Sequence, residues 1–279
     1  MKIWIGTDME GVAGVIDREH TARDGREHDR ARAWMTDEVN AVIAGCFDAG
    51  AAAVTVTDGH GTCRNLIPER LDSRARLVNG QLSSLPPSMV AGLDATFGAA
   101  MLIGYHARAG LHPGVLDHTA WSQTVAEVRL NGRPVGEAEL NAAVAGEMGI
   151  PTVLVSGDDV LATELAQSMP QTHTYVTKRA LGRFQADSPH PAVVCAGLRE
   201  AATRAVQAAA AIEPYVPSRP VTIELQFHHP MYTELAAMVP GCRKTGTWTA
   251  AFTGDTFMAA FGAFTAMCGV TGIAHYQHR

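Results

Sequence analysis

Two carboxylates follow the first strand-like run of this sequence. Residues 2–5 are short and largely apolar, and Asp8 and Glu10 come soon after them in a turn bounded by glycines. While the backbone stays extended, side chains two positions apart point to the same side, so both carboxylates would project together. Buried carboxylates repel each other and lose hydration, and a bound cation would remove both costs. An acidic turn open to water is an equally good interpretation of this pair alone.

Histidines follow two later strand-like runs in the same way. The run at residues 53–57 ends shortly before His60, and the run at residues 99–104 ends shortly before His106. Parallel α/β sheets bind ligands outside the carboxyl ends of their strands, because the loops there converge. We therefore expect both imidazoles to reach the sheet edge that carries the two carboxylates. The alternative for each imidazole is an ordinary hydrogen-bonded histidine.

A third carboxylate stands at the start of a predicted helix. Asn131-Gly132 predicts a tight turn, and the next helix begins at about Glu137. The helix dipole favours an acid in the first turn, so Glu137 also has a structural reason to be there. Asn141 lies one turn further along the same face and is a candidate to contact a substrate. His118 lies upstream in a loop that contains glycine and proline.

These side chains form a mixed nitrogen and oxygen donor set. Such a set suits zinc, manganese or iron better than calcium, which prefers oxygen alone. Five ligands are too many for one tetrahedral catalytic zinc with an open position. They match two metals, about 3.5–4 Å apart, that share a bridging carboxylate, for which Asp8 at the centre of the edge is the candidate. The five candidate ligands are Asp8, Glu10, His60, His106 and Glu137.

The elements that must position these residues alternate between strand and helix. This alternation predicts an α/β fold with a mostly parallel sheet flanked by helices. We expect residues 1–170 to form the metal-binding catalytic domain. The pattern changes beyond Pro170, where residues 171–279 are expected to form a smaller α+β domain. This second domain would complete the pocket and supply contacts between subunits.

Composition restricts the classes of partner. The 279 residues are 47% hydrophobic and 18% charged, with a formal net charge of −6. A mild negative charge with no basic stripe argues against nucleic acid as a partner. We also expect no membrane partner, because no apolar run approaches the ~20 residues of a span. Five scattered cysteines without a C-x-x-C pair indicate a reducing, cytoplasmic setting.

Six short blocks together resemble the zinc-dependent D-aminopeptidase family, typified by the enzyme of a bacterial dipeptide-transport operon. They occur in order at residues 7–11, 58–60, 104–108, 113–118, 133–137 and 244–247. The resemblance implies two zinc ions per subunit, with manganese or iron as alternatives, on the five candidate ligands named above. It places the catalytic histidine of the family, described as a nucleophile, at His118. It also implies a homodecamer whose active sites face an internal chamber.

The resemblance implies a dinuclear aminopeptidase that cleaves the N-terminal bond of short peptides, including peptides that begin with a D-residue. We favour His118 as general base and acid, because a metal-activated water already supplies a nucleophile. The alternative is a metal-dependent hydrolase of another amide or of a phosphate ester. For a phosphate ester Arg108 is the only obvious anion-binding side chain near the predicted site. A binding module with a structural cation is a third, non-enzymatic interpretation.

A glycine-broken segment near the C-terminus offers further substrate contacts. Lys244, Thr245, Gly246 and Thr247 could meet a substrate carboxylate, or stabilise an oxyanion through backbone N–H groups. A plain β-turn is an equally good interpretation of this segment.

Overall fold

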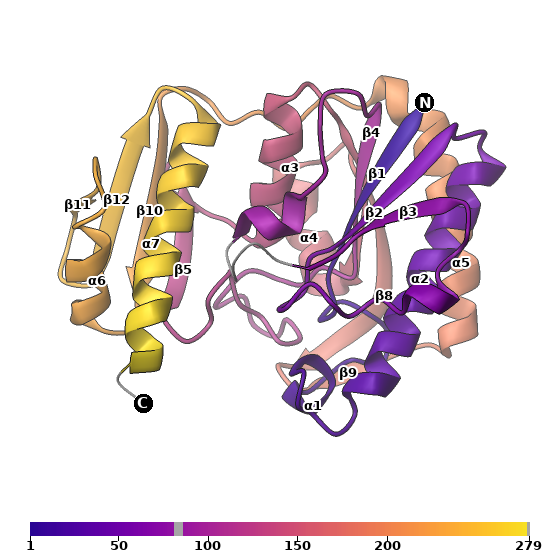
Figure 1. The fold of residues 1–279 in the computed structure, drawn as a ribbon, viewed down its shortest axis with the longest axis horizontal. Coiled ribbons are helices and arrows are strands. Elements are labelled where there is room, and N and C mark those ends of the chain that lie inside the picture. The colour runs from indigo at the N-terminus through magenta and orange to yellow at the C-terminus, as the bar shows by residue number, and fades with distance from the viewer. Residues whose placement is uncertain (81–85, 278–279) are drawn as a thin grey trace.

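Sheet A occupies the larger part of the molecule in the computed structural model, which describes residues 1–80 and 86–277 (Figure 1). Six of its seven described strands are parallel, and the edge strand β9 pairs antiparallel with β8. The strands, in their order across the sheet, are β3 (Ala75–Val78), β2 (Ala53–Asp58), β1 (Lys2–Thr7), β4 (Ala99–Ile103), β7 (Thr152–Asp158), β8 (His173–Gly182) and β9 (Gln185–Asp187).

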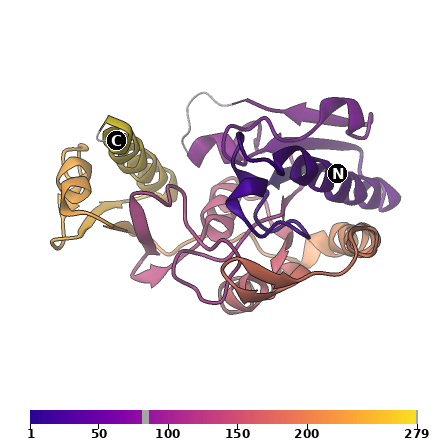
Figure 2. The ribbon, with the colours of Figure 1, turned by 90° about the horizontal axis from the view of Figure 1, so that it is seen from below.

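Helices cover both faces of sheet A because its central strands are apolar on both sides. Along β1, Ile3 and Ile5 pack into one apolar cluster and Trp4 into another, as the alternation of side chains in a strand requires. The first cluster includes α2 (His28–Asp48) and α5 (Pro191–Ala208), which pack together on the side away from sheet B (Figures 1 and 2). The second includes α3 (Glu137–Glu147) and α4 (Asp159–Ser168).

Sheet B is a smaller antiparallel sheet. Its strand order is β11 (Arg243–Lys244), β12 (Thr249–Gly254), β10 (Val221–Phe227), β5 (Val125–Leu130) and β6 (Arg133–Pro134). The turn at Asn131-Gly132 joins β5 to β6 with both residues at positive φ, as predicted from that dipeptide. Sheet B packs against α6 (Pro230–Ala236) and α7 (Phe257–Gln277). The remaining short elements are α1 (Arg18–Thr21), η1 (Pro68–Arg70), η2 (Pro86–Val90) and η3 (Ala209–Ala211).

The predicted fold class is confirmed. The mostly parallel sheet and the helices on its two faces follow the predicted alternation. The predicted boundary at residue 170 does not coincide with the change of sheet. Strands β8 and β9 and helix α5, from beyond residue 170, complete the sheet A layers, whereas the β5–β6 hairpin, from before it, belongs to sheet B.

Helix α7 is the last element of the described chain. It continues to Gln277, and His275 Nδ1 lies 2.9 Å from the hydroxyl of Tyr232. Among the described residues, this helix alone is long and apolar enough for a membrane span, with a mean hydropathy of 1.7. Glycine and threonine interrupt the apolar residues of α7, so the sequence shows no continuous apolar run there. Of its most apolar window, 56% is buried inside the structure.

Candidate metal centre

The centre lies where three adjacent parallel strands end. Strand β1 lies between β2 and β4 and is in register with both, so its last residue, Thr7, pairs with Asp58 and Ile103. Asp8 directly follows β1, while His60 and His106 follow the two flanking strands. Asp8, His60 and His106 therefore converge on one sheet edge, as predicted from the strand ends.

Asp8 lies between the two imidazoles. Its Oδ1 is 3.0 Å from His60 Nδ1, and its Oδ2 is 3.3 Å from His106 Nε2. Glu10 Oε2 is 2.9 Å from the same His60 nitrogen. Asp8 therefore presents one oxygen to each side, which is the arrangement that a bridging carboxylate needs.

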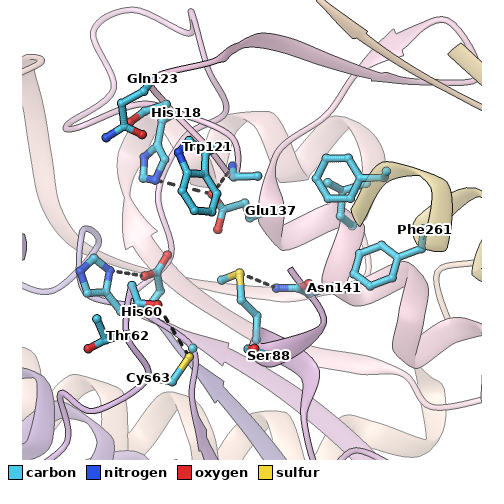
Figure 3. A pocket seen from close by; sticks show the side chains of 18 of the residues that line it. His60, Thr62, Cys63, Ser88, His118, Trp121, Gln123, Glu137, Asn141 and Phe261 are labelled. Atoms are coloured by element: carbon cyan, nitrogen blue, oxygen red, sulfur yellow. Dashed lines mark hydrogen bonds and ion pairs between the residues drawn. The ribbon is translucent and has the colours of Figure 1, made fainter. Parts of the chain in front are cut away.

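Glu137 and His118 complete the cluster from the other side (Figure 3). Glu137 is the first residue of α3, and its Oε1 lies 3.5 Å from His106 Nε2 and 3.6 Å from His118 Nε2. The same oxygen accepts a hydrogen bond of 2.7 Å from the backbone N–H of Ala120. The rings of His106 and His118 stack with centroids 4.0 Å apart. All six predicted ligand and catalytic side chains are thus in one place.

Each imidazole is oriented by a backbone carbonyl. His60 Nε2 lies 2.9 Å from the carbonyl oxygen of Thr21, His106 Nδ1 lies 3.0 Å from that of Ala107, and His118 Nδ1 lies 2.9 Å from that of Leu116. A carbonyl oxygen only accepts, so these nitrogens carry the proton. The nitrogen that faces the carboxylates is then the one with a lone pair for a metal in each neutral ring, as in metal-ligating histidines generally.

While the rings keep this neutral tautomer, three buried atoms at the centre face only other acceptors, so they have no hydrogen-bond partner among the described residues. They are Asp8 Oδ2, Glu10 Oε2 and His106 Nε2. Leaving a buried polar atom unsatisfied costs about 1–3 kcal/mol. Two overlapping groups of ligand atoms, each within 4.8 Å of one another, could hold metal ions: one contains Asp8, Glu10 and His106, and the other His106, His118 and Glu137. The residues present therefore fit transition-metal ions, which would satisfy these atoms.

The charges of this cluster shift its pKa values strongly. Burial would raise the pKa of Asp8, but the adjacent imidazoles hold it well below its usual value. Burial would likewise lower the pKa of His60 and His106, but the nearby carboxylates raise both well above the usual value. In the metal-free protein these imidazoles hold protons that a metal must displace, so metal affinity should rise with pH.

A cavity of about 320 Å³ opens over the centre. Its polar side is formed by Asp8, His60, His118 and Glu137, as Figure 3 shows. Its other side is apolar and comes mainly from η2, α3 and α7, with Met89, Trp121, Leu140, Phe261 and Phe264. Asn141 also lines the cavity, and its side-chain amide donates a hydrogen bond of 2.9 Å to the hydroxyl of Tyr105.

The segment at residues 244–247 lies elsewhere. Lys244 ends β11, and Thr245, Gly246 and Thr247 form the exposed turn that leads to β12. None of the four is among the described residues that line the cavity. The hydroxyl of Thr245 donates to Glu224 Oε2 at 2.6 Å. A substrate contact by this segment stays a prediction.

No sequence pattern marks the groups that orient the candidate ligands. The backbone carbonyls of Thr21, Ala107 and Leu116 hold the three imidazoles, and every residue has a carbonyl. The segment at residues 17–32 contains α1, and the carbonyl oxygen of its last residue, Thr21, lies 2.9 Å from His60 Nε2. The glycine that follows Glu10 is a sequence feature that reflects how closely this segment packs. A Cβ at Gly11 would lie 1.8 Å from the carbonyl oxygen of Tyr105, so only glycine fits there.

Three comparisons with known proteins agree. A family model of M55 peptidases, described as D-aminopeptidase, matches residues 1–266. A D-aminopeptidase of Bacillus subtilis (strain 168) is 36% identical over 268 residues, which cover 96% of each chain. A solved structure of the Zn-dependent D-aminopeptidase DppA from Bacillus subtilis, described as a self-compartmentalizing protease, superposes with a TM-score of 0.93 at 35% identity over 98% of each chain.

Proposed function

Because this chain belongs to the M55 peptidase family of D-aminopeptidases, we propose that it is a dinuclear aminopeptidase that removes the N-terminal residue of short peptides, including peptides that begin with a D-residue. One observation carries the proposal for the metal site. While the imidazoles are neutral, three buried ligand atoms of Asp8, Glu10 and His106 have no hydrogen-bond partner among the described residues, and they lie beside a cavity lined by Asp8, His60, His118 and Glu137. A peptide-sized space directly above such donors is what a metallopeptidase requires.

Two zinc ions are the proposed cofactor, with manganese or iron as alternatives. Asp8, Glu10, His60, His106 and Glu137 would hold them, with one Asp8 oxygen directed to each side. A bound metal pair supplies Lewis acidity, which polarises a carbonyl and lowers the pKa of water. This role is supported by the Zn-dependent relative DppA.

The charges around the cavity support attack at the N-terminal end of a peptide. Among the described residues that line it there is no lysine or arginine, and the charged ones are Asp8, Glu137 and the histidines. Apart from the proposed metal ions, such a surface has no cationic side chain to hold the carboxylate of a peptide C-terminus or a phosphate group. An N-terminal exopeptidase fits this distribution better than a carboxypeptidase or a phosphatase does.

His118 is the proposed general base and acid. Its Nδ1–H is held by the Leu116 carbonyl, and its Nε2 points toward Glu137 at the edge of the cavity. A neutral imidazole has one nitrogen with a lone pair that accepts a proton, so His118 can take a proton from the attacking water and deliver it to the leaving amine.

His118→Ala should lower kcat by about 100-fold or more while two metal ions per chain remain, as measured by elemental analysis. The matched control is His112→Ala, because His112 lines a different cavity and should leave kcat unchanged. Loss of one metal ion from the His118→Ala protein would instead make His118 a ligand.

Hydrolysis by the purified protein tests the proposed function directly. Elemental analysis should find about two transition-metal ions per chain. The metal-replete protein should release p-nitroaniline from D-Ala p-nitroanilide faster than from L-Ala p-nitroanilide, and it should not cleave p-nitrophenyl phosphate. Faster cleavage of the phosphate ester, or metal binding with no turnover of either anilide or of di- and tripeptides, would overturn the proposal.

We also propose that the chain assembles into a homo-oligomer, a decamer by family resemblance. The relative DppA is described as self-compartmentalizing, and this chain exposes large apolar side chains on and near α6 and α7, including Met238, Ile273 and Tyr276. Light scattering should give about ten times the chain mass of 29.6 kDa. A monomer at that measurement would overturn this proposal and leave the peptidase proposal standing.

A cytoplasmic location is proposed as well. All five cysteines are free, and Cys46, Cys63 and Cys268 are buried, which suits a reducing compartment. Cell fractionation tests it, and recovery of the protein with the secreted or membrane fraction would contradict it.

A further inference from the structure

A lysine is buried directly behind the metal ligands. Lys178 lies on β8 with 1% of its surface exposed, although lysine is almost never fully buried unless its charge is compensated. Its Nζ donates hydrogen bonds to the carbonyl oxygens of Glu10 at 2.5 Å, Val12 at 2.9 Å and Val15 at 2.5 Å. An ammonium has three protons, so these three acceptors satisfy it completely.

All three carbonyls belong to the segment that carries Asp8 and Glu10. This segment, residues 8–16, connects β1 to the turn before α1 and has no regular structure to fix its backbone. The neighbouring Thr177 adds a hydrogen bond of 2.5 Å from its hydroxyl to the carbonyl oxygen of Gly11. From α2, Glu38 accepts a hydrogen bond of 2.8 Å from the N–H of Ala13. The segment is thus tied to β8 by a run of carbonyl contacts.

Glu10 is held at both ends by this arrangement. Its carbonyl oxygen contacts Lys178, and its carboxylate Oε2 lies 2.9 Å from His60 Nδ1. Because the carbonyls of residues 10, 12 and 15 converge on one ammonium, the chain must curve around it. This curvature fixes the backbone of Glu10 and with it the direction of the carboxylate. The positive charge also offsets part of the negative charge that Asp8 and Glu10 bring to the interior.

We propose that Lys178 is a positioning residue that holds Glu10 in the geometry for binding metal. The proposal rests on the metal role that the proposed function gives to this site. It differs from a purely structural role, because it requires an effect on the affinity of the folded protein for zinc, beyond any effect on folding.

The test is Lys178→Met, which keeps the aliphatic length of the side chain and removes all three donors. Zinc affinity is measured by competition of the metal-free protein with a chromogenic chelator, at a temperature where circular dichroism reports folded protein. We expect the affinity for one of the two zinc ions to fall by about 10- to 100-fold, the usual effect of losing a group that orients a ligand. An affinity equal to that of the unchanged protein would overturn the proposal.

The control for stability is Leu198→Ala. Leu198 is fully buried on α5, in the apolar cluster below sheet A, and contributes no polar contact to residues 8–16. Its truncation destabilises the fold, yet zinc affinity should stay unchanged. If both variants weaken zinc binding alike, the effect of Lys178→Met is a loss of stability and the proposal fails.

A double-mutant cycle tests whether Lys178 acts through Glu10. In a Glu10→Gln background, Lys178→Met should change zinc affinity by less than about threefold, because the ligand that it positions is already lost. A full effect in that background would contradict the proposal. If Lys178→Met does not fold, Thr177→Val replaces it, since this change removes the hydroxyl that contacts the carbonyl oxygens of Gly11 and Gly157 and leaves the Lys178 contacts in place. It should weaken zinc binding in the same direction by a smaller factor, and unchanged binding would overturn the proposal.

Zinc binding and peptide hydrolysis separate this inference from the proposed function. If the unchanged protein binds two zinc ions and hydrolyses no peptide, the proposed function fails, and the chelator competition still decides the role of Lys178. If peptides are cleaved and Lys178→Met binds zinc normally, the inference fails alone.

Discussion

Asp8 is the residue on which the two sides of the centre depend. Each of its oxygens faces a different imidazole, at 3.0 Å and 3.3 Å, and the residue is 2% exposed. An asparagine at this position would keep one oxygen and direct an amide N–H₂, which only donates, toward the other side. An amide therefore cannot present an oxygen to both sides of the cluster.

Asp8→Asn should accordingly reduce the metal content to below about one ion per chain and lower kcat/KM by at least about 100-fold. Elemental analysis and anilide hydrolysis measure these effects. The control is Asp117→Asn, because Asp117 is adjacent to His118 in sequence but pairs with Arg183 and the N–H of Gly110. A metal content of two in the Asp8→Asn protein would contradict the bridging role.

A second residue-scale prediction concerns Glu38. Burial raises its pKa to about 7, although the Ala13 N–H and the Lys178 charge lower it in part. A raised pKa in the folded state means that its stabilising contribution is complete below pH ~4.5 and is lost as the pH rises through about 7. The cost of ionising it reaches on the order of 3 kcal/mol.

Glu38→Gln stays neutral and keeps an oxygen for the N–H of Ala13. The free energy of unfolding of this variant, relative to the unchanged protein, should therefore increase between pH 5 and pH 8 by about 3 kcal/mol in denaturant titrations. Glu200→Gln, on the exposed side of α5, should show no such trend. A difference that is constant with pH would show that Glu38 is ionised throughout.

Helix α7 is the element that shapes the apolar side of the cavity. Phe261 and Phe264 line the cavity from this helix. Figure 3 shows Phe261 on the side of the cavity opposite His60, a proposed metal ligand. A wall of this kind limits the size of the substrate side chain that binds next to the reacting bond. One methylene group in such a pocket is worth about 1–3 kcal/mol.

Phe261→Ala should raise the ratio of kcat/KM for D-Phe over D-Ala p-nitroanilide by about tenfold or more, because it enlarges the cavity. It should also destabilise the fold by about 3–5 kcal/mol, since Phe261 is 3% exposed. Val194→Ala, buried on α5 in the other apolar cluster, is the control for stability and should leave the ratio unchanged. An unchanged ratio in Phe261→Ala would exclude this wall from substrate contact.

The sequence predicted the elements around the centre because their signals are local. Apolar runs that end in a polar group mark β1, β2 and β4, and parallel topology then brings Asp8, His60 and His106 together. The pairing of β5 with β10 was out of reach, because it joins residues about 95 positions apart and depends on the whole fold. Lys178 looked like an ordinary strand residue, since its three acceptors are backbone carbonyls that carry no sequence signature.

At the scale of the whole molecule, the proposed metal centre joins the end of β1 to the start of α3 and to the loop that carries His118. Metal that binds only the folded protein stabilises it by mass action. The like charges of Asp8, Glu10 and Glu137 lie close together in the metal-free state, and Asp8 Oδ2 and Glu10 Oε2 have no hydrogen bond there while the nearby imidazoles are neutral.

Removal of metal with a chelator should therefore lower Tm by about 5–10 °C, and zinc should restore it. Differential scanning calorimetry of the protein before and after chelation measures the shift. The Asp8→Asn protein is the control and should show a much smaller shift. An equal Tm with and without metal would contradict the prediction that metal bound at this cluster stabilises the fold.

The apolar cluster that contains α3 does not stop at the boundary between the sheets. Trp4 and Leu102 of sheet A belong to the same cluster as Ile223 and Leu225 of sheet B and Phe264 of α7. Where sheet A and sheet B meet, neither presents a surface to water. A fragment cut at residue 170 would leave sheet A without its outer strands and α3 without α7. Each half would then expose apolar core residues to water. Unfolding should therefore disrupt both sheets together, and limited proteolysis should release no folded half.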